Sequence, residues 1–225
     1  MPEVRGQLLP VYVMADESMS MNDHIGELNA GLTSLHEGLM AEPMAAAKVR
    51  FSVLGFSNDV VVRLHLTDLR RESQLPELFS RGATSYSAAF TALQLHIPQD
   101  VASLKRDQFQ VHRPAVFFLS DGQPSDGGSW REPHRRLTDR SITRAAPNII
   151  ACGIGDAKPE TILAVATHPD FAFVTIEGTQ VGPAIAKFCT ALTKSIVASG
   201  RSLTTENPEL VVDKPEGFRM AIDVI

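Results

Sequence analysis

Residues 9–22 read LPVYVMADESMSMN, an apolar run followed directly by a cluster of polar side chains. Residues 9–15 are apolar, which is typical of a short buried strand, and the run stops at the carboxylate of Asp16. Two hydroxyl side chains follow at Ser18 and Ser20, so three oxygen donors are spaced two residues apart. A buried strand that ends in such donors indicates a site for a divalent metal ion.

The rest of the chain alternates between short apolar runs and segments with helical spacing. Strands are predicted at residues 48–56, 60–66, 114–119, 148–154 and 171–176, and helices at residues 22–40, 85–97, 129–144, 159–167 and 181–199. The turn at 57–59 is so short that the strands on either side of it must be antiparallel. The pattern therefore predicts an α/β fold: a doubly wound, mostly parallel sheet with one antiparallel edge strand and helices on both faces.

The character of the sequence changes near residue 200. Residues 1–200 are predicted to form one domain, and residues 201–225 a C-terminal tail that has two prolines and no helical period. Two alternatives stay open for this tail. It forms a short strand, at 210–212 or 219–225, or it is a disordered extension.

Composition argues against several classes of partner. The net charge of −5 leaves no broad basic field for nucleic acid, and no apolar run approaches the ~20 residues that span a bilayer. Cys152 and Cys189 are too few for a disulfide framework. Glu3 and Arg5 leave the region before the first apolar run without the positive charge of a signal peptide. We therefore expect a cytoplasmic protein that binds neither nucleic acid nor membranes.

Two more polar segments are expected at the edge of the sheet where Asp16 lies. Thr84 belongs to RGATS (81–85), just before a predicted helix, and Asp121 follows a predicted strand in LSDGQPSD (119–126). The set of donors is then Asp16, Ser18, Ser20, Thr84 and Asp121. These hard oxygens suit Mg²⁺, with Mn²⁺ or Ca²⁺ as substitutes. Mg²⁺ takes six oxygens, so at least one position is left for an incoming carboxylate or phosphate.

Each of these motifs alone has a plainer explanation. Asp16 and the serines could cap the helix that follows them, and Thr84 could cap its own helix. The pair Asp121-Gly122 could form an ordinary turn. The prediction of a metal site therefore depends on all three segments meeting at one edge of the sheet.

D-x-S-x-S followed by Thr and then Asp resembles the metal-ion-dependent adhesion site (MIDAS) of von Willebrand factor type A domains, and the resemblance covers residues 9 to about 199. More narrowly, LPVYVMADESMSM, VRFSVLGFS, RGATS, PAVFFLSDGQPSD and NIIACGIGD resemble bacterial cytoplasmic TerY-like proteins of tellurium-resistance and stress-response systems. The resemblance implies that the hydroxyls of Ser18, Ser20 and Thr84 bind the ion, and that Asp16 and Asp121 bind it directly or through water.

The same resemblance implies a partner. An acidic side chain of another protein would take the open metal position. Relatives of this kind occur beside protein kinases and phosphatases, so a kinase or phosphatase of the same system is the expected partner, with this chain as a scaffold.

The chain departs from the usual motif in ways that bear on the partner. Met19 and Ala83 stand where glycines are usual, and Glu17 adds negative charge beside the site. We therefore expect Glu17 and Met19 to face the partner. Residues 130–144, WREPHRRLTDRSITR, place five arginines near the predicted metal edge, either as a solvated helix face or as a docking surface anchored by Trp130 with Arg131.

Two other functions are alternatives to this one. A metal-dependent phosphatase of the D-x-D type would need a second aspartate at the position of Ser18, and the chain has neither a G-x-S-x-G elbow nor a P-loop. An assembly module with little metal dependence is the other alternative. The prediction is a non-enzymatic interaction domain, with a metal-dependent phosphatase or other hydrolase as the alternative.

Overall fold

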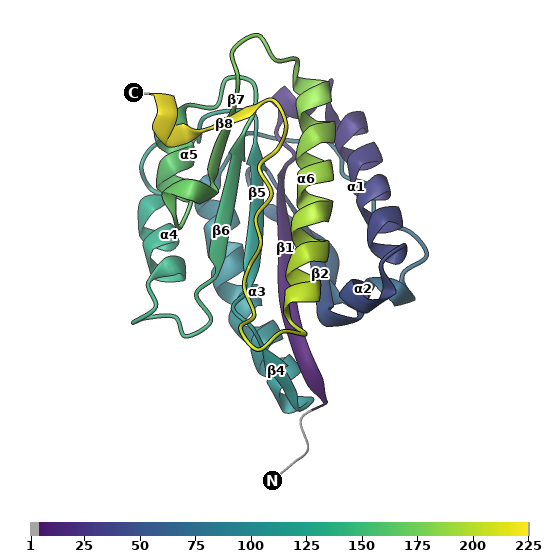
Figure 1. Cartoon of the computed structure of the whole chain (residues 1–225). Helices are drawn as coiled ribbons and strands as arrows, with labels where there is room; N and C mark the ends of the chain where they lie inside the picture. The colour runs from purple at the N-terminus through teal and green to yellow at the C-terminus, as the bar shows by residue number, and fades with distance from the viewer. Residues whose placement is uncertain (1–4, 225) are drawn as a thin grey trace.

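The computed structural model describes residues 5–224, and a central sheet with helices on both faces organises them (Figure 1). The sheet has eight strands in this part of the chain, in the order β3-β2-β1-β5-β6-β7-β8, with β4 paired to β1. Their bounds are β1 (Gly6–Asp16), β2 (Val49–Phe56), β3 (Val60–Thr67), β4 (Phe109–Val111), β5 (Ala115–Ser120), β6 (Asn148–Gly153), β7 (Ala172–Thr175) and β8 (Phe218–Met220).

The predicted fold class is confirmed, with one addition. Strands β2, β1, β5, β6 and β7 are parallel, and β3 is antiparallel to β2 as the short turn requires. A second antiparallel strand, β8, closes the opposite edge against β7. In the central pairs Ala15 lies opposite Leu119 and Ser120 opposite Gly153, so these parallel strands end at the same level.

Helices cover both faces of this sheet. They are α1 (Ile25–Met40), α2 (Pro43–Lys48), α3 (Tyr86–Arg106), α4 (Arg131–Thr138), α5 (Pro159–Val165) and α6 (Val181–Ser202). Alternate residues of β1 point to opposite faces, as strand geometry dictates. Val11 and Val13 therefore pack in a core with α1 and α6, whereas Tyr12 and Met14 pack in a second core with α3, α4 and α5.

Two helix predictions fail at their ends. Helix α3 runs past Pro98, where the sequence predicted an end, because the apolar stripe continues through Ile97 to the buried Val101. Helix α4 stops at Thr138, where 129–144 was predicted. The cause is Asp139, whose Oδ1 accepts hydrogen bonds from the backbone N (2.8 Å) and Oγ (2.6 Å) of Ser141, which forms a turn instead.

The segment after α6 packs against the domain. It runs back along the sheet beside α6 to β8 (Figure 1), and Leu203 and Phe218 are buried. Ser199 Oγ accepts a hydrogen bond from Val211 N (2.8 Å), and Ser195 Oγ accepts one from Asp213 N (2.8 Å). A disordered extension is therefore wrong for residues 203–222. The predicted strand at 210–212 does not form, and the one at 219–225 is reduced to β8, with Ile225 outside the described residues.

Helix α6 has the length and composition that a membrane span would need, which the sequence reading overlooked. Half of its most apolar 18-residue window is buried inside this structure, against α1 and α2 and in one core with residues of the sheet. A helix in the core of a protein can have the same length and apolar composition, so these two properties of α6 are weak support for a membrane span.

Candidate metal centre

The predicted donors gather at the carboxyl ends of the central strands, at the top of Figure 1. Asp16 ends β1 and Asp121 follows β5, its direct neighbour in the sheet. Asp16, Ser18, Thr84 and Asp121 are buried, and Ser20 is exposed. The parallel register of the two strands is what places these loops side by side.

A chain of hydrogen bonds joins the first loop to the loop after β5. Ser20 Oγ donates to Asp121 Oδ1 at 2.8 Å, and the Ser18 and Ser20 hydroxyl oxygens are 2.9 Å apart. Asp16 Oδ1 accepts from Ser18 N at 2.8 Å, and its Oδ2 accepts from Ser120 Oγ at 2.5 Å. Four of the five predicted donors therefore lie within one connected network.

Thr84 is brought to this network through its backbone neighbours. Met19 N donates to Gly82 O (3.0 Å), which ties the Thr84 loop to the first loop. Ser125 donates to Thr84 O through both its backbone N (2.8 Å) and its Oγ (2.9 Å), which ties it to the loop after β5. Hydrogen bonds thus join the Thr84 loop to the first loop and to the loop after β5.

Sequence reasoning missed Asp126, which orients the helix behind Thr84. Its Oδ2 accepts hydrogen bonds from Ser85 Oγ (2.9 Å) and Ser87 N (2.7 Å), while Ser85 Oγ caps the helix by accepting from Ala88 N (3.1 Å). The signal was present in the last two letters of LSDGQPSD, since a second Ser-Asp pair follows the first.

The electrostatics of the site favour a cation. Burial raises the pKa of Asp16 to about 6, although hydrogen bonds from Ser120 and Ser18 oppose the shift. Burial also raises the pKa of Asp121, against the hydrogen bond from Ser20. Two desolvated carboxylates therefore share one small region, where the charge of His24 opposes the shift at Asp121 alone, and a divalent ion would stabilise the ionised forms of both.

The donor set fits a hard divalent ion. It consists of two carboxylates and three hydroxyls, the oxygen ligands that Mg²⁺, Mn²⁺ and Ca²⁺ prefer. Residues 5–224 hold no group of three or more His, Cys, Asp or Glu side chains placed to share a metal. The described residues therefore form no metal site built from His, Cys, Asp and Glu side chains alone, and the hydroxyl-rich set is the candidate metal centre.

Glu17 does not face a partner, and that prediction is wrong. Its side chain is fully buried and its carboxylate pairs with two arginines: Arg63 Nε lies 2.8 Å from Oε1, and Arg81 Nε lies 2.6 Å from Oε2. A second Arg63 nitrogen donates to Oε2 at 3.0 Å. The carboxylate lies against Gly55 of β2, where an added Cβ would stand 2.1 Å from Glu17 Cδ.

This buried carboxylate fixes the loop that carries Thr84. Arg81 begins the RGATS segment, its Nη2 donates to Gly55 O (2.9 Å), and Arg63 comes from β3. Glu17 therefore connects the first loop, the edge strand and the Thr84 loop from beneath the site. Sequence reasoning missed both arginines, because nothing local relates positions 17, 63 and 81.

Trp130 is also wrong as a partner anchor. It is 2% exposed and packs with Tyr86 and Phe90, with ring centroids 5.9 and 5.8 Å away. Met19, by contrast, is 61% exposed at the rim of the site. Arg131 is exposed as well, with its guanidinium 4.9 Å from the Trp130 ring. Of the four residues predicted to face a partner, Met19 and Arg131 are accessible.

The five arginines of residues 130–144 do not gather at the metal edge, contrary to the prediction. Arg135 and Arg136 both pair with Glu132 on α4. Arg140 and Arg144 lie beyond the end of α4, in the walls of pockets near the start of β5 and β6. The cause is the parallel pairing of β5 and β6, because the chain must return from the carboxyl end of β5 to the amino end of β6, away from the metal loops.

The fold and this site define a class of protein. The family profile of the von Willebrand factor type A domain matches residues 11–182, which is most of the chain. The chain belongs to this family. A search of curated proteins found no match.

Several solved structures share the fold. Proximal thread matrix protein 1 from the mussel byssus is 14% identical, with a TM-score of 0.58 over 86% of this chain and 49% of its own. The pilus adhesin SpaC from Lactobacillus rhamnosus GG is 12% identical, with a TM-score of 0.65 over 85% of this chain and 30% of its own. A von Willebrand factor type A structure from Catenulispora acidiphila is 13% identical, with a TM-score of 0.55 over 85% and 43%.

At such identities the likeness is one of fold. This chain spans less than half the length of each of these neighbours. A further structure of the mussel protein, at 15% identity and a TM-score of 0.55 over 85% of this chain and 46% of its own, is described with a zinc-occupied MIDAS motif.

Proposed function

We propose that this chain is a non-enzymatic interaction domain that binds a divalent cation, Mg²⁺ before Mn²⁺ or Ca²⁺, and uses it to hold an acidic side chain of a partner protein. The residues proposed to hold the ion are Asp16, Ser18, Ser20, Thr84 and Asp121. The observation that carries the proposal is the hydrogen-bonded network from Asp16 and Ser18 through Ser20 to Asp121, which links loops 101 residues apart in sequence.

Hydrogen bonds and ion pairs within the chain fix the positions of the proposed ligand loops. Ser120 and the Ser18 backbone position the Asp16 carboxylate, Ser125 holds the Thr84 loop, and Glu17 with its arginines fixes the base. The ion, when bound, would supply net positive charge to an incoming carboxylate. In a half-buried site such an attraction is roughly 4 kcal/mol per pair of unit charges, against about 1 kcal/mol in bulk water.

The partner and its setting are the finer part of the proposal. Met19, between the proposed ligands Ser18 and Ser20, is exposed and suits a protein surface with an apolar side chain beside its acidic one; exposed Arg131 is proposed to contact the same partner. The resemblance of residues 9–21 and 114–126 to TerY-like proteins supports a scaffold in a bacterial tellurium-resistance or stress-response system, with a kinase or phosphatase as partner. Free, buried Cys152 and Cys189 accord with a cytoplasmic location.

Calorimetric titration with MgCl₂, MnCl₂ and CaCl₂ tests the ion. We expect one site per chain, and Thr84→Ala or Asp121→Asn should weaken binding at least tenfold. Asp107→Asn is the matched control, since Asp107 is an exposed carboxylate at the end of α3 and is not a proposed ligand. Equal affinity in wild type and Asp121→Asn would contradict the proposal.

A second measurement separates the proposed function from its alternative. Phosphomonoester hydrolysis is measured with Mg²⁺ and with Mn²⁺, and no turnover is expected. Turnover that Asp16→Ala abolishes would instead support a metal-dependent phosphatase.

A further inference from the structure

We propose a second binding site, at the end of the molecule opposite the metal centre, for a small organic anion: a carboxylate or phosphate group attached to an apolar body. The pocket is about 460 Å³, within the range of about 300–1,000 Å³ that suits small ligands. The inference rests on different residues from those of the metal centre and does not depend on the proposed function.

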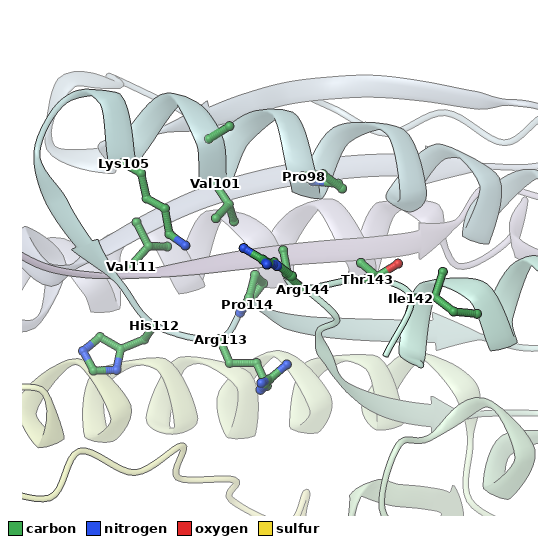
Figure 2. A pocket seen from close by; sticks show the side chains of 12 residues that line it. Pro98, Val101, Lys105, Val111, His112, Arg113, Pro114, Ile142, Thr143 and Arg144 are labelled. Atoms are coloured by element: carbon green, nitrogen blue, oxygen red, sulfur yellow. The ribbon is translucent and has the colours of Figure 1, made fainter. Parts of the chain in front are cut away.

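The pocket lies at the amino ends of the strands. It is bounded by the second half of α3, the connection from β4 to β5, and residues 142–145 (Figure 2). Pro114 at its wall precedes β5, and Asp121 follows β5, so a six-residue strand of about 20 Å separates the two sites.

Apolar side chains make up most of the wall. Seven of the twelve residues that line it are apolar: Pro98, Val101, Ala102, Val111, Pro114, Ile142 and Ala145. Pro98 and Val101 lie one turn apart on α3 and face the pocket. The Ile142 side chain is 54% exposed at its rim. An apolar ligand body would bury this surface and gain roughly 25 cal/mol for each Å² removed from water.

Two cationic side chains face each other across the pocket. In Figure 2 the ammonium group of Lys105 on α3 and the guanidinium group of Arg144 point toward one another. Within residues 5–224 neither makes a salt bridge, and the residues that line the pocket include no Asp or Glu. Two like charges directed at one space repel each other, and an anion between them would reverse that repulsion.

The other basic residues of the pocket have structural roles. Arg113 turns away from Lys105 and Arg144, and its Nη1 donates to Ala146 O (2.5 Å). His112 also turns away, with Nε2 2.7 Å from Gln7 Oε1. Arg113 thereby holds the segment that carries Arg144, and its positive charge adds to the field of the pocket without occupying it. The anion-binding pair is Lys105 and Arg144.

This arrangement selects the chemistry of the ligand. A bare inorganic ion would leave the apolar wall in water, and a neutral apolar molecule would leave the two cations unpaired. A ligand with an apolar body and an anionic head covers the apolar wall and pairs with the two cations, whether its head is a carboxylate or a phosphate. Arg144 favours either head, because its planar guanidinium can donate two parallel hydrogen bonds.

The test uses matched probes in calorimetric titrations of the full chain. The probes are 1-naphthyl phosphate and 1-naphthoate as the two anionic heads, 1-naphthylmethanol as the neutral body, and inorganic phosphate as the head alone. We expect both naphthyl anions to bind at one site, and the neutral body and inorganic phosphate to bind at least tenfold more weakly. The tighter of the two anions identifies the preferred head.

Variants localise the binding. Lys105→Gln and Arg144→Gln should each weaken the anionic probes about tenfold, as expected for the loss of one charge-assisted contact. Ala102→Trp should block the pocket by filling it from an exposed helical position. Arg106→Gln, the next residue on α3 and outside the pocket, is the matched control and should bind as wild type does.

Circular dichroism and melting temperature establish that each variant is folded. Binding of the naphthyl anions that is unaffected by both Lys105→Gln and Arg144→Gln would overturn the proposal, as would the absence of binding at millimolar probe. Addition of EDTA should leave the probe affinity unchanged. Loss of probe binding on chelation would place the anion at the metal edge instead and would equally overturn this assignment.

Discussion

Replacement of Glu17 by Gln is the sharpest test of how the metal loops are supported. The Glu17 carboxylate is fully buried, and the two arginine side chains that hold it are only 17% and 25% exposed. Glutamine keeps the size of the side chain but removes its charge, so little cavity forms. Arg63 then loses the charge that compensates it in a poorly hydrated place, and Arg81 keeps only the exposed Asp59.

The expected cost follows from this burial. Breaking a buried ion pair costs about 3–5 kcal/mol, and the partial exposure of the two arginines places Glu17→Gln near the lower value, about 3 kcal/mol. For a chain of this size, each kcal/mol lowers the melting temperature by roughly 2–4 °C. We therefore expect the variant to melt about 6–12 °C below wild type in a calorimetric or circular-dichroism scan.

Two further variants distinguish the loss of the buried Glu17 charge from the effect of any substitution in the same region on the melting temperature. Asp59→Asn removes an exposed partner of the same arginine, Arg81, and should melt close to wild type. The double variant Glu17→Gln/Arg63→Met should lose less stability than the sum of its single changes, because each removes the other's unpaired group. If Glu17→Gln melts within about 2 °C of wild type, or if the two changes are additive, the buried network does not stabilise the site as argued.

Four more predictions address other parts of the molecule. Gly55→Ala should lower the melting temperature, because its Cβ would stand 2.1 Å from Glu17 Cδ, and an unchanged value would contradict the packing described. Saturating Mg²⁺, at about 100 times its Kd, should raise the melting temperature by roughly 5–11 °C through about 2.7 kcal/mol of binding energy; Asp121→Asn should abolish this rise. Hydrogen bonding to Arg70 lowers the pKa of Asp68 in the folded chain. The stabilisation that Asp68 contributes is therefore fully present above its pKa in the unfolded chain and is lost as the pH falls through its lower pKa in the folded chain. The difference in urea midpoint between wild type and Asp68→Asn should accordingly shrink below about pH 4. Phe218→Ala should cost about 3 kcal/mol, since the ring is buried where β8 meets β7, and a loss under 1 kcal/mol in urea unfolding would show that the C-terminal segment adds little to the domain.

The sequence was sufficient for those features that depend on local pattern. Leucines at 28, 32, 35 and 39 predicted α1, and all four are buried. The turn at 57–59 predicted the antiparallel β3, because so short a connection permits no other pairing. The donor set stays a prediction, and what the pattern supplied is the meeting of the three loops, because parallel strands end at a common edge and the polar residues follow the strand ends directly.

Four features needed the folded chain. Glu17 looked like an exposed neighbour of the site, and its burial depends on arginines 46 and 64 residues away. Trp130 was predicted to be a surface anchor, but it packs against Tyr86 and Phe90 of α3. The segment after α6 lacks any periodic signal, yet its backbone finds partners on α6. Arg144 was predicted to lie near the metal edge, and the return of the chain to the start of β6 places it at the opposite end.

The sequence by itself therefore determined the alternation of strands and helices and predicted the oxygen donors, because both follow from spacing along the chain and from the chemistry of single side chains. Only the tertiary structure decided which charges are buried and which remain accessible. The cost of burying an ion depends on the partners that surround it in space, and those partners come from segments that no local pattern relates.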